Sequence, residues 1–389
     1  MTENVVVLGA GYAGAGAVKQ LQSELGPDTQ LTWIADVDYH LVLHESHRVI
    51  RDPDVRSDVT FPVEEIADPS TQFIQAEVTG LDTEERVVEL ADGESVEYDY
   101  VMVGLGTKTA YYGIPGLEAH SLTLKSLDDA LAINEAITEA SEAATRGDPA
   151  QVVIGGAGLS GIQTAGEIAE FRDIHRAPIE IHLVEALEEI FPGNDPEIQQ
   201  ALRELLEEAG VRIHTDDPIT EATEDVIEFD EGEPLDHDVL VWTGGITGRD
   251  ALDDADLEKE HNRVHADATF QTSDERVFAI GDSAILDQGD QPAPPTAQAA
   301  WQAAELVGEN ISRAIEGRPL KSWEYDNKGT VVSVGEKAVA HEIKPAFGIG
   351  LPVDTFGGVP AKNLKKMIAA RWIADMTSWN TARKCWSSL

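Results

Sequence analysis

The sequence predicts an α/β fold made of two similar strand–turn–helix units and a C-terminal α+β segment. The stretch VVVLGAGYAGAGAVKQL (residues 5–21) resembles QVVIGGAGLSGIQTAGEIAEF (residues 151–171). Each reads as an apolar strand, a glycine turn and an Ala-rich helix. A second apolar strand follows each helix, at residues 31–36 and 179–185. Two copies of one α/β unit are therefore expected in this chain.

The glycines of both turns have the spacing G-x-G-x-x-G, and they are Gly9, Gly11, Gly14, Gly156, Gly158 and Gly161. The first glycine of each set permits a tight turn, and the second lets the backbone approach a pyrophosphate. The third lets the helix pack closely on the strand, so that the diphosphate lies at the positive helix N-terminus. The sequence therefore predicts two Rossmann-like dinucleotide-binding domains.

An acidic residue ends the second strand of each unit. Asp36 and Glu185 are placed to accept hydrogen bonds from ribose hydroxyls. Asp38, in the following loop, is the alternative to Asp36, and the position at the strand end favours Asp36. Because a carboxylate repels a 2′-phosphate, Glu185 predicts a preference for NADH over NADPH.

Composition restricts the class of protein. The 389 residues include 72 acidic and 28 basic ones, for a formal charge of −44, and 42% are apolar. So acidic a surface repels nucleic acid and is typical of a protein adapted to high salt, where the Debye length falls to about 3 Å. No secretory signal and no run of 18 apolar residues is evident, so a cytoplasmic location is expected.

The single cysteine, Cys385, rules out a redox-active cysteine pair within the chain. His40, His44 and His47 lie in one segment, but neither cysteine nor a suitably spaced carboxylate accompanies them. We therefore expect no metal in this protein.

Five motifs in order, GAGYAG, VGLGT (103–107), GAGLSG, VWTGGI (241–246) and VFAIGD (277–282), resemble the two-dinucleotide-binding flavoprotein superfamily. The resemblance implies that the first unit binds FAD, that the second unit is inserted and binds NADH, and that the chain then returns to the FAD domain. It also implies that Asp282 bonds the ribityl or pyrophosphate part of FAD. The expected domains are residues 1–115 and 251–320 for FAD, 116–250 for NADH, and 321–389 at the C-terminus.

Within this superfamily the chain is most similar to type II NADH:quinone oxidoreductases. Residues 38–45, DYHLVLHE, resemble their segment beside the flavin, and residues 297–302, AQAAWQ, fit their AQ-x-A-x-Q quinone-site pattern. Gln298 and Gln302 are four apart, so they share one helix face. The family usually has Glu, close to the nicotinamide, where this chain has Gln163. An ordinary Ala-rich packing helix is the alternative for residues 297–302.

The predicted catalytic residues are therefore Gln298, Gln302 and Gln163. The predicted cofactor-binding residues, from the glycine turns and from the resemblance together, are Gly9, Gly11, Tyr12, Ala13, Gly14, Asp36, Gly106, Thr107, Asp282, Ala297, Gly156, Gly158, Leu159, Ser160, Gly161, Glu185 and Gly245.

The C-terminal 29 residues reverse the charge of the chain. They contain Lys362, Lys365, Lys366, Arg371, Arg383 and Lys384 but a single acid, Asp375, and apolar residues recur at steps of three and four. A basic, Trp-bearing amphipathic helix suits an anionic membrane face, and the family resemblance agrees. A helix packed in a homodimer interface is the alternative.

The sequence thus predicts a peripheral enzyme of the inner membrane face that transfers hydride from NADH to FAD and electrons to quinone without pumping protons. Three alternatives stay open at this point. One is a soluble NADH reductase of a ferredoxin or other small acceptor. The others are a sulfide:quinone reductase-like protein without the catalytic cysteines, and a non-catalytic FAD-binding interaction protein.

Overall fold

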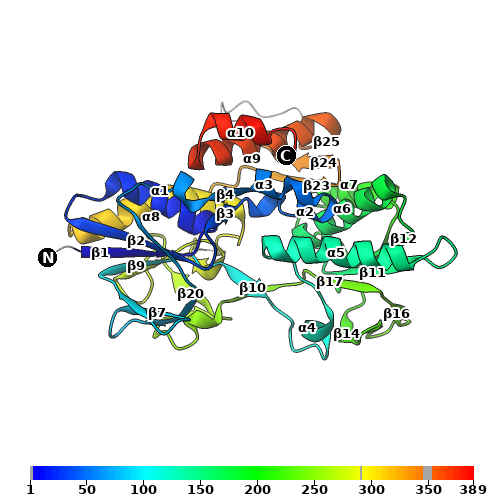
Figure 1. The fold of residues 1–389 in the computed structure, drawn as a ribbon, viewed down its shortest axis with the longest axis horizontal. Coiled ribbons are helices and arrows are strands. Elements are labelled where there is room, and N and C mark those ends of the chain that lie inside the picture. Colours follow the sequence, from blue (N-terminus) through cyan, green and yellow to red (C-terminus); the bar gives the residue numbers. More distant parts are fainter. Residues whose placement is uncertain (1–2, 290, 345–352) are drawn as a thin grey trace.

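The computed structural model describes residues 3–289, 291–344 and 353–389, and two parallel sheets dominate it (Figure 1). The first sheet has the order β21-β9-β1-β2-β5 and the second has the order β13-β12-β11-β17. All neighbouring strands in both sheets are parallel. The strands are β1 (Glu3–Leu8), β2 (Thr29–Ala35), β5 (Gln72–Gln75), β9 (Tyr100–Val103), β21 (Val277–Ala279), β11 (Ala150–Gly155), β12 (Ile179–Val184), β13 (Val211–His214) and β17 (Val239–Trp242).

Smaller antiparallel sheets and ribbons connect or flank these two sheets. Two of them are two-stranded: β3 (Tyr39–Leu41) with β4 (Thr60–Pro62), and β10 (Thr107–Thr109) with β18 (Ile246–Gly248). Two are three-stranded: β6 (Val78–Asp82), β7 (Val87–Leu90) and β8 (Ser95–Glu97), and β14 (Ile219–Ala222), β15 (Val226–Phe229) and β16 (Leu235–Asp236). In the last, β19 (Lys259–Glu260) is antiparallel to β20 (Arg263–Ala266), and β20 is parallel to β22 (Ala284–Leu286). The β10–β18 ribbon joins the two halves of the molecule, and it is the crossing that Figure 1 shows near the middle.

The helices are α1 (Tyr12–Glu24), α2 (Arg48–Arg51), α3 (Arg56–Val59), α4 (Leu117–His120), α5 (Leu127–Ala143), α6 (Leu159–His175), α7 (Pro196–Glu208), α8 (Ala297–Ile315), α9 (Gly358–Met376) and α10 (Trp379–Cys385). The local sequence explains several of their ends. Ser126 and Asp129 form a capping box at the start of α5, Asp195 caps α7 before Pro196, and Thr296 caps α8. Helix α8 therefore begins after Pro295.

Small residues bring α1 and α8 into close contact on the first sheet. A methyl group added at Gly16 would lie 2.6 Å from the Cβ of Ala304, and one added at Gly308 would lie 2.8 Å from the Cβ of Gln20. The Ala-rich sequence of both helices permits this approach. One face of α8 therefore packs on the protein, as the alternative of an ordinary packing helix for residues 297–302 predicted. Ala300, Ala303 and Ala304 are buried on this face.

The C-terminal segment pairs an antiparallel sheet with two helices. Strands β23 (Thr330–Val334), β24 (Lys337–His341) and β25 (Thr355–Gly357) form the sheet, and α9 and α10 lie along one side of the molecule (Figure 1). Trp372 of α9 is fully buried and stacks on Tyr12 with ring centroids 4.5 Å apart. Its Nε1 donates to His40 Nε2 at 2.8 Å. The C-terminal segment is therefore anchored in the core of the first Rossmann-like unit.

The amphipathic pattern expected for α9 is partly wrong. Trp372, Ile373 and Met376 are buried, whereas Met367 and Ile368 are exposed, so the apolar residues lie on both faces of the helix. Lys365 was expected on the basic surface, but only 4% of it is exposed. One face of α9 packs on the protein because its Trp and Ile fit the core, and the other face keeps apolar residues in solvent.

Trp372→Ala should lower the free energy of unfolding by about 3–5 kcal/mol, because it removes a fully buried indole and the hydrogen bond to His40. Chemical denaturation followed by circular dichroism measures this loss. Trp379→Ala is the matched control, since Trp379 in α10 is 70% exposed and its loss should change stability by no more than about 0.5 kcal/mol. Equal effects of the two substitutions would contradict the anchoring of α9.

Candidate functional site: two glycine turns and a buried polar cluster

The first glycine turn connects β1 to α1. Gly9 has a φ of +95°, and a Cβ on Gly14 would lie 1.8 Å from the Gly9 carbonyl oxygen. Both positions therefore require glycine. Gly11 differs, because a Cβ there would meet no atom within 4 Å, and no side chain caps the helix that follows. The turn thus leaves an open backbone surface at a helix N-terminus, where a diphosphate fits.

The second turn, between β11 and α6, repeats this geometry. Gly156 has a φ of +90°, a Cβ on Gly161 would lie 1.9 Å from the Gly156 carbonyl oxygen, and a Cβ on Gly158 would meet nothing within 4 Å. Leu159 and Ser160, the first residues of α6, are exposed beside it. Glu185, at the end of β12, accepts hydrogen bonds from Ala157 N at 2.8 Å and Leu187 N at 3.1 Å. This carboxylate is held against the turn with one further lone pair on each oxygen.

A groove of about 400 Å³ runs from the first turn along the carboxyl ends of the first sheet. Six of the predicted residues line it, namely Gly9, Gly11, Asp36, Gly106, Thr107 and Asp282, whereas Asp38 does not. The side chains of Tyr12 and Ala13 are buried in the core instead, so these residues offer a ligand only their backbone. Gly245 is packed against the Tyr112 ring, and a Cβ there would lie 1.9 Å from the Tyr112 hydroxyl.

Basic residues that the sequence analysis did not single out also line this groove. They are Lys108, Lys125 and Arg249. Burial raises the pKa of Asp282 although Lys125 and Arg263 oppose the change, and burial lowers the pKa of Lys125 although Asp282 opposes it. These charges come from distant segments, and no local motif marks them. Four acidic residues, Asp36, Glu77, Asp250 and Asp282, line the same groove, so the three cations partly offset this negative charge where a phosphate-bearing ligand would lie.

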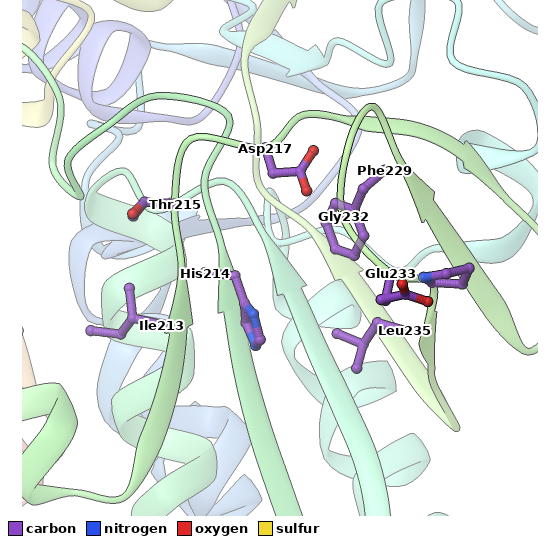
Figure 2. A pocket seen from close by; sticks show the side chains of 9 residues that line it. Ile213, His214, Thr215, Asp217, Phe229, Gly232, Glu233 and Leu235 are labelled. Carbon is purple, nitrogen blue, oxygen red and sulfur yellow. The ribbon is translucent and has the colours of Figure 1, made fainter.

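A second hollow, of about 590 Å³, lies between β13 and the β14–β16 sheet (Figure 2). Its lining includes His214, Asp217 and Phe229 but none of the predicted residues. His214 Nε2 lies 3.0 Å from His182 Nδ1, and the His182 Nε2 lies 3.0 Å from Gln151 Oε1. The imidazoles are thus held in an internal chain, and we assign this hollow no role in the chemistry.

The glutamines of α8 hold the chain that leads into β23. Gln298 Oε1 accepts from the Tyr325 hydroxyl at 2.9 Å and from Lys328 N at 2.8 Å, while its Nε2 donates to Gly329 O. Gln302 makes a reciprocal pair of bonds with the Asp326 backbone at 2.9 and 3.1 Å. The two glutamines do lie on one helix face. In this structure they position a backbone segment, and contact with an acceptor stays a prediction, as does the part of Ala297 in cofactor binding.

Gln163 belongs to a buried polar cluster where the two Rossmann-like units and the C-terminal segment meet. Its Nε2 donates to Ser333 Oγ at 3.2 Å, and Lys365 Nζ donates to the same oxygen at 2.9 Å. His47 Nε2 lies 3.1 Å from Lys365 Nζ and 3.4 Å from Gln163 Nε2. The Lys365 ammonium also lies 3.1 Å from Glu45 Oε1. The sequence predicted a catalytic role for Gln163 alone, because the residues that meet here come from distant parts of the chain.

The two carboxylates of this cluster, Glu45 and Glu167, have pKa values shifted in opposite directions. Burial alone would raise the pKa of Glu45, but Lys365 and Arg48 hold that pKa well below its usual range. Burial raises the pKa of Glu167 to about 7, although the Nε of Arg51 is 3.3 Å away. Neither oxygen of Glu167 has a hydrogen-bond partner among the described residues. Burial likewise lowers the pKa of Lys365 to about 8.

The three histidines of the 40–47 segment have separate partners. His40 bonds Ala10 O and Trp372, His44 bonds the Tyr12 hydroxyl, and His47 belongs to the buried cluster. Burial lowers the pKa of His40 and His44 to about 4. All three are therefore accounted for by packing and hydrogen bonding.

Glu167→Gln should stabilise the protein increasingly as the pH rises from 5 to 8. The unfolded chain ionises this carboxyl near 4.5 and the folded protein near 7, so the stability it confers is present below pH 4.5 and is lost as the pH rises through 7. Gln cannot ionise, and its advantage should reach about 3 kcal/mol at most. Denaturation midpoints across pH measure it, with exposed Glu139→Gln as the control. A pH-independent difference would contradict a neutral Glu167.

Comparison with known proteins supports the same architecture. Residues 3–304 match the model of the family described as pyridine nucleotide-disulphide oxidoreductase. Type II NADH:quinone oxidoreductases from Staphylococcus saprophyticus and Staphylococcus aureus are 28% and 29% identical, over 95% of this chain and 94% of theirs.

Among solved structures, NDH2 from Plasmodium falciparum in complex with NADH superposes with a TM-score of 0.81 at 16% identity, over 100% of this chain and 97% of that one. The sulfide:quinone oxidoreductase from Aquifex aeolicus superposes with a TM-score of 0.78 at 18% identity, over 97% and 92%. The two glycine turns, the two parallel sheets and the matched residues lead to one conclusion: this chain belongs to the pyridine nucleotide-disulphide oxidoreductase family.

Proposed function

We propose that this protein is a type II NADH:quinone oxidoreductase, which oxidises NADH and reduces quinone without moving protons across the membrane. The observation that carries the proposal is the pair of open glycine positions, Gly11 and Gly158, each at the carboxyl edge of its own parallel sheet. The chain is similar to the staphylococcal enzymes over 95% of its length. The absence of a redox-active cysteine pair agrees with an enzyme that needs no thiol.

FAD fits the first groove. The open edge at Gly11 and the uncapped start of α1 would receive the diphosphate, Asp36 the ribose and Asp282 the ribityl chain, with Gly106 and Thr107 along the groove. The second turn would hold NADH in the same way, and the Glu185 carboxylate would repel a 2′-phosphate. Bound FAD would supply the chemistry that accepts a hydride from NADH and passes two electrons to quinone.

The chain's own residues have supporting roles in this proposal. Gln298 and Gln302 keep the N-terminal part of α8 and the segment 325–329 together. Gln163, from the NADH-binding unit, is bonded to Ser333 of the C-terminal segment. The proposed domain limits are residues 1–115, 116–250, 251–320 and 321–389. The hydrogen bonds just named connect these domains and would help to set the distance between the two bound nucleotides.

An anaerobic titration tests the function and separates the two pockets. In molar KCl, NADH should bleach the yellow wild-type protein, and a water-soluble quinone should restore the colour. Gly158→Val should stay yellow but need far more NADH to bleach, whereas Gly11→Val should lose most of its flavin, because each side chain would occupy space that a diphosphate needs.

Gly26→Val is the matched control, since a Cβ there also meets nothing within 4 Å and Gly26 lies outside both turns. It should behave as the wild type. Bleaching without recolouring would show that the acceptor is not a quinone, and a failure of NADH to bleach the wild type would remove the NADH assignment.

We also propose that α9 and α10 dock the enzyme on the inner face of the membrane. Among the described residues no helix is long and apolar enough to cross a bilayer. Val359, Met367 and Trp379 are 70%, 52% and 70% exposed, and the same two helices carry the basic residues Lys362, Lys366, Arg371, Arg383 and Lys384. Exposed apolar groups on basic helices suit an anionic lipid surface better than a two-fold dimer interface, in which these basic helices would face their own copy.

The double substitution Met367→Ser with Trp379→Ser should lower binding to vesicles that contain anionic lipid by about tenfold or more, because two large apolar groups no longer enter the bilayer. Cosedimentation in molar KCl measures this binding. Ile174→Ser is the control, since Ile174 is 61% exposed on α6. A change of oligomeric mass with unaltered vesicle binding would instead assign this surface to a homodimer.

A further inference from the structure

We infer that Asp195, Glu197 and His341 form a binding site for a divalent transition-metal ion of the zinc type. Asp195 caps α7, Glu197 lies in its first turn, and His341 ends β24. One potential ligand atom from each side chain lies within 4.8 Å of those from the other two. The site would join the NADH-binding unit to the C-terminal sheet, at the right of Figure 1, and it departs from our expectation that the protein binds no metal.

Hydrogen bonds orient all three side chains. Asp195 Oδ1 accepts from Glu197 N at 2.8 Å, and Thr355 Oγ1 donates to Glu197 Oε2 at 3.0 Å. Thr355 Oγ1 also lies 2.7 Å from His341 Nδ1. One oxygen of each carboxylate is thus held by the protein, and no hydrogen bond or ion pair of the described residues uses the other.

These bonds also fix the tautomer of His341. A hydroxyl has one proton, and Thr355 uses it for the Glu197 carboxylate, so the 2.7 Å bond requires the imidazole to donate from Nδ1. The lone pair of a neutral ring is then on Nε2. His341 is only 7% exposed, and its Nε2 is buried without a hydrogen-bond partner among the described residues. A histidine that donates through one nitrogen and leaves the other free is how metal-binding histidines are usually held.

The ligand set selects the class of ion. An imidazole nitrogen with two carboxylates favours Zn²⁺ and its neighbours in the first transition row, whereas Mg²⁺ and Ca²⁺ prefer oxygen ligands alone. Ligands bound to zinc at about 2.0–2.2 Å lie roughly 3–3.6 Å apart. The carboxylates are exposed, so the free oxygen of each can move toward the ion while the other oxygen keeps its hydrogen bond. Water would complete the coordination, because only three protein ligands are available.

The full-length, FAD-containing protein should be stripped with EDTA, dialysed into molar KCl and titrated with ZnCl₂. Zinc bound per chain by equilibrium dialysis, and the thermal unfolding midpoint, are the readouts. Wild type should bind one zinc ion more tightly than any other and unfold at a higher temperature when it is bound. Glu197→Gln, on the surface, should weaken that binding at least about tenfold and remove the stabilisation.

Glu207→Gln is the matched control, because Glu207 is an exposed carboxylate on the same helix. It should bind zinc as the wild type does. His341→Gln, if folded, should lose the tight site as Glu197→Gln does. Equal zinc binding by the wild type, Glu197→Gln and Glu207→Gln would show that surface carboxylates bind the ion adventitiously, and the proposal would be overturned. A competing excess of MgCl₂ should not displace the zinc, and displacement would contradict the nitrogen ligand.

Discussion

The close approach of a helix to a glycine turn is the constraint on which the rest of this molecule depends. At Gly14 and at Gly161 a single added carbon would lie 1.8 and 1.9 Å from a carbonyl oxygen of the preceding turn. Only glycine permits the helix to begin there, directly above the carboxyl end of its strand. This start leaves the backbone N–H groups of the first turn open beside a groove. The two proposed nucleotide sites follow from repeating that one arrangement.

The C-terminal segment depends on a different interaction, the burial of charge between segments. Lys365 enters the protein from α9 and is 4% exposed, so its ammonium group needs the Glu45 carboxylate 3.1 Å away. Removing one partner would leave the other charged and buried, which costs far more than the pair itself contributes. The stacking of Trp372 on Tyr12 acts beside it. The ion pair ties α9 to the segment that follows β3, and the stacking ties it to the first turn of α1, next to the predicted flavin site.

A strongly acidic surface surrounds these buried contacts. The formal charge of −44 disfavours a compact chain in dilute buffer, and molar salt screens that repulsion. Buried pairs such as Lys365 and Glu45 are screened much less. Some cations have an acidic partner close by, as Lys108 has Asp250 in the groove and Lys365 has Glu45 in the buried cluster. A metal ion between α7 and β24 would neutralise further acidic groups at the boundary of two units.

The sequence alone determined the two Rossmann-like units, their glycine turns and the acidic residues that end β2 and β12. These features are local, because strand, turn and helix follow one another within about thirty residues and each glycine is required by its own turn. Only the tertiary structure decided that Lys365 is buried, that Gln298 and Gln302 hold the 325–329 segment, and that Glu167 has no hydrogen-bond partner among the described residues. Those outcomes depend on contacts between residues more than a hundred positions apart or on the path of a loop. A short sequence motif does not identify partners that are so distant. The burial of a side chain and the pairing of its charge are therefore decided only when the whole chain folds.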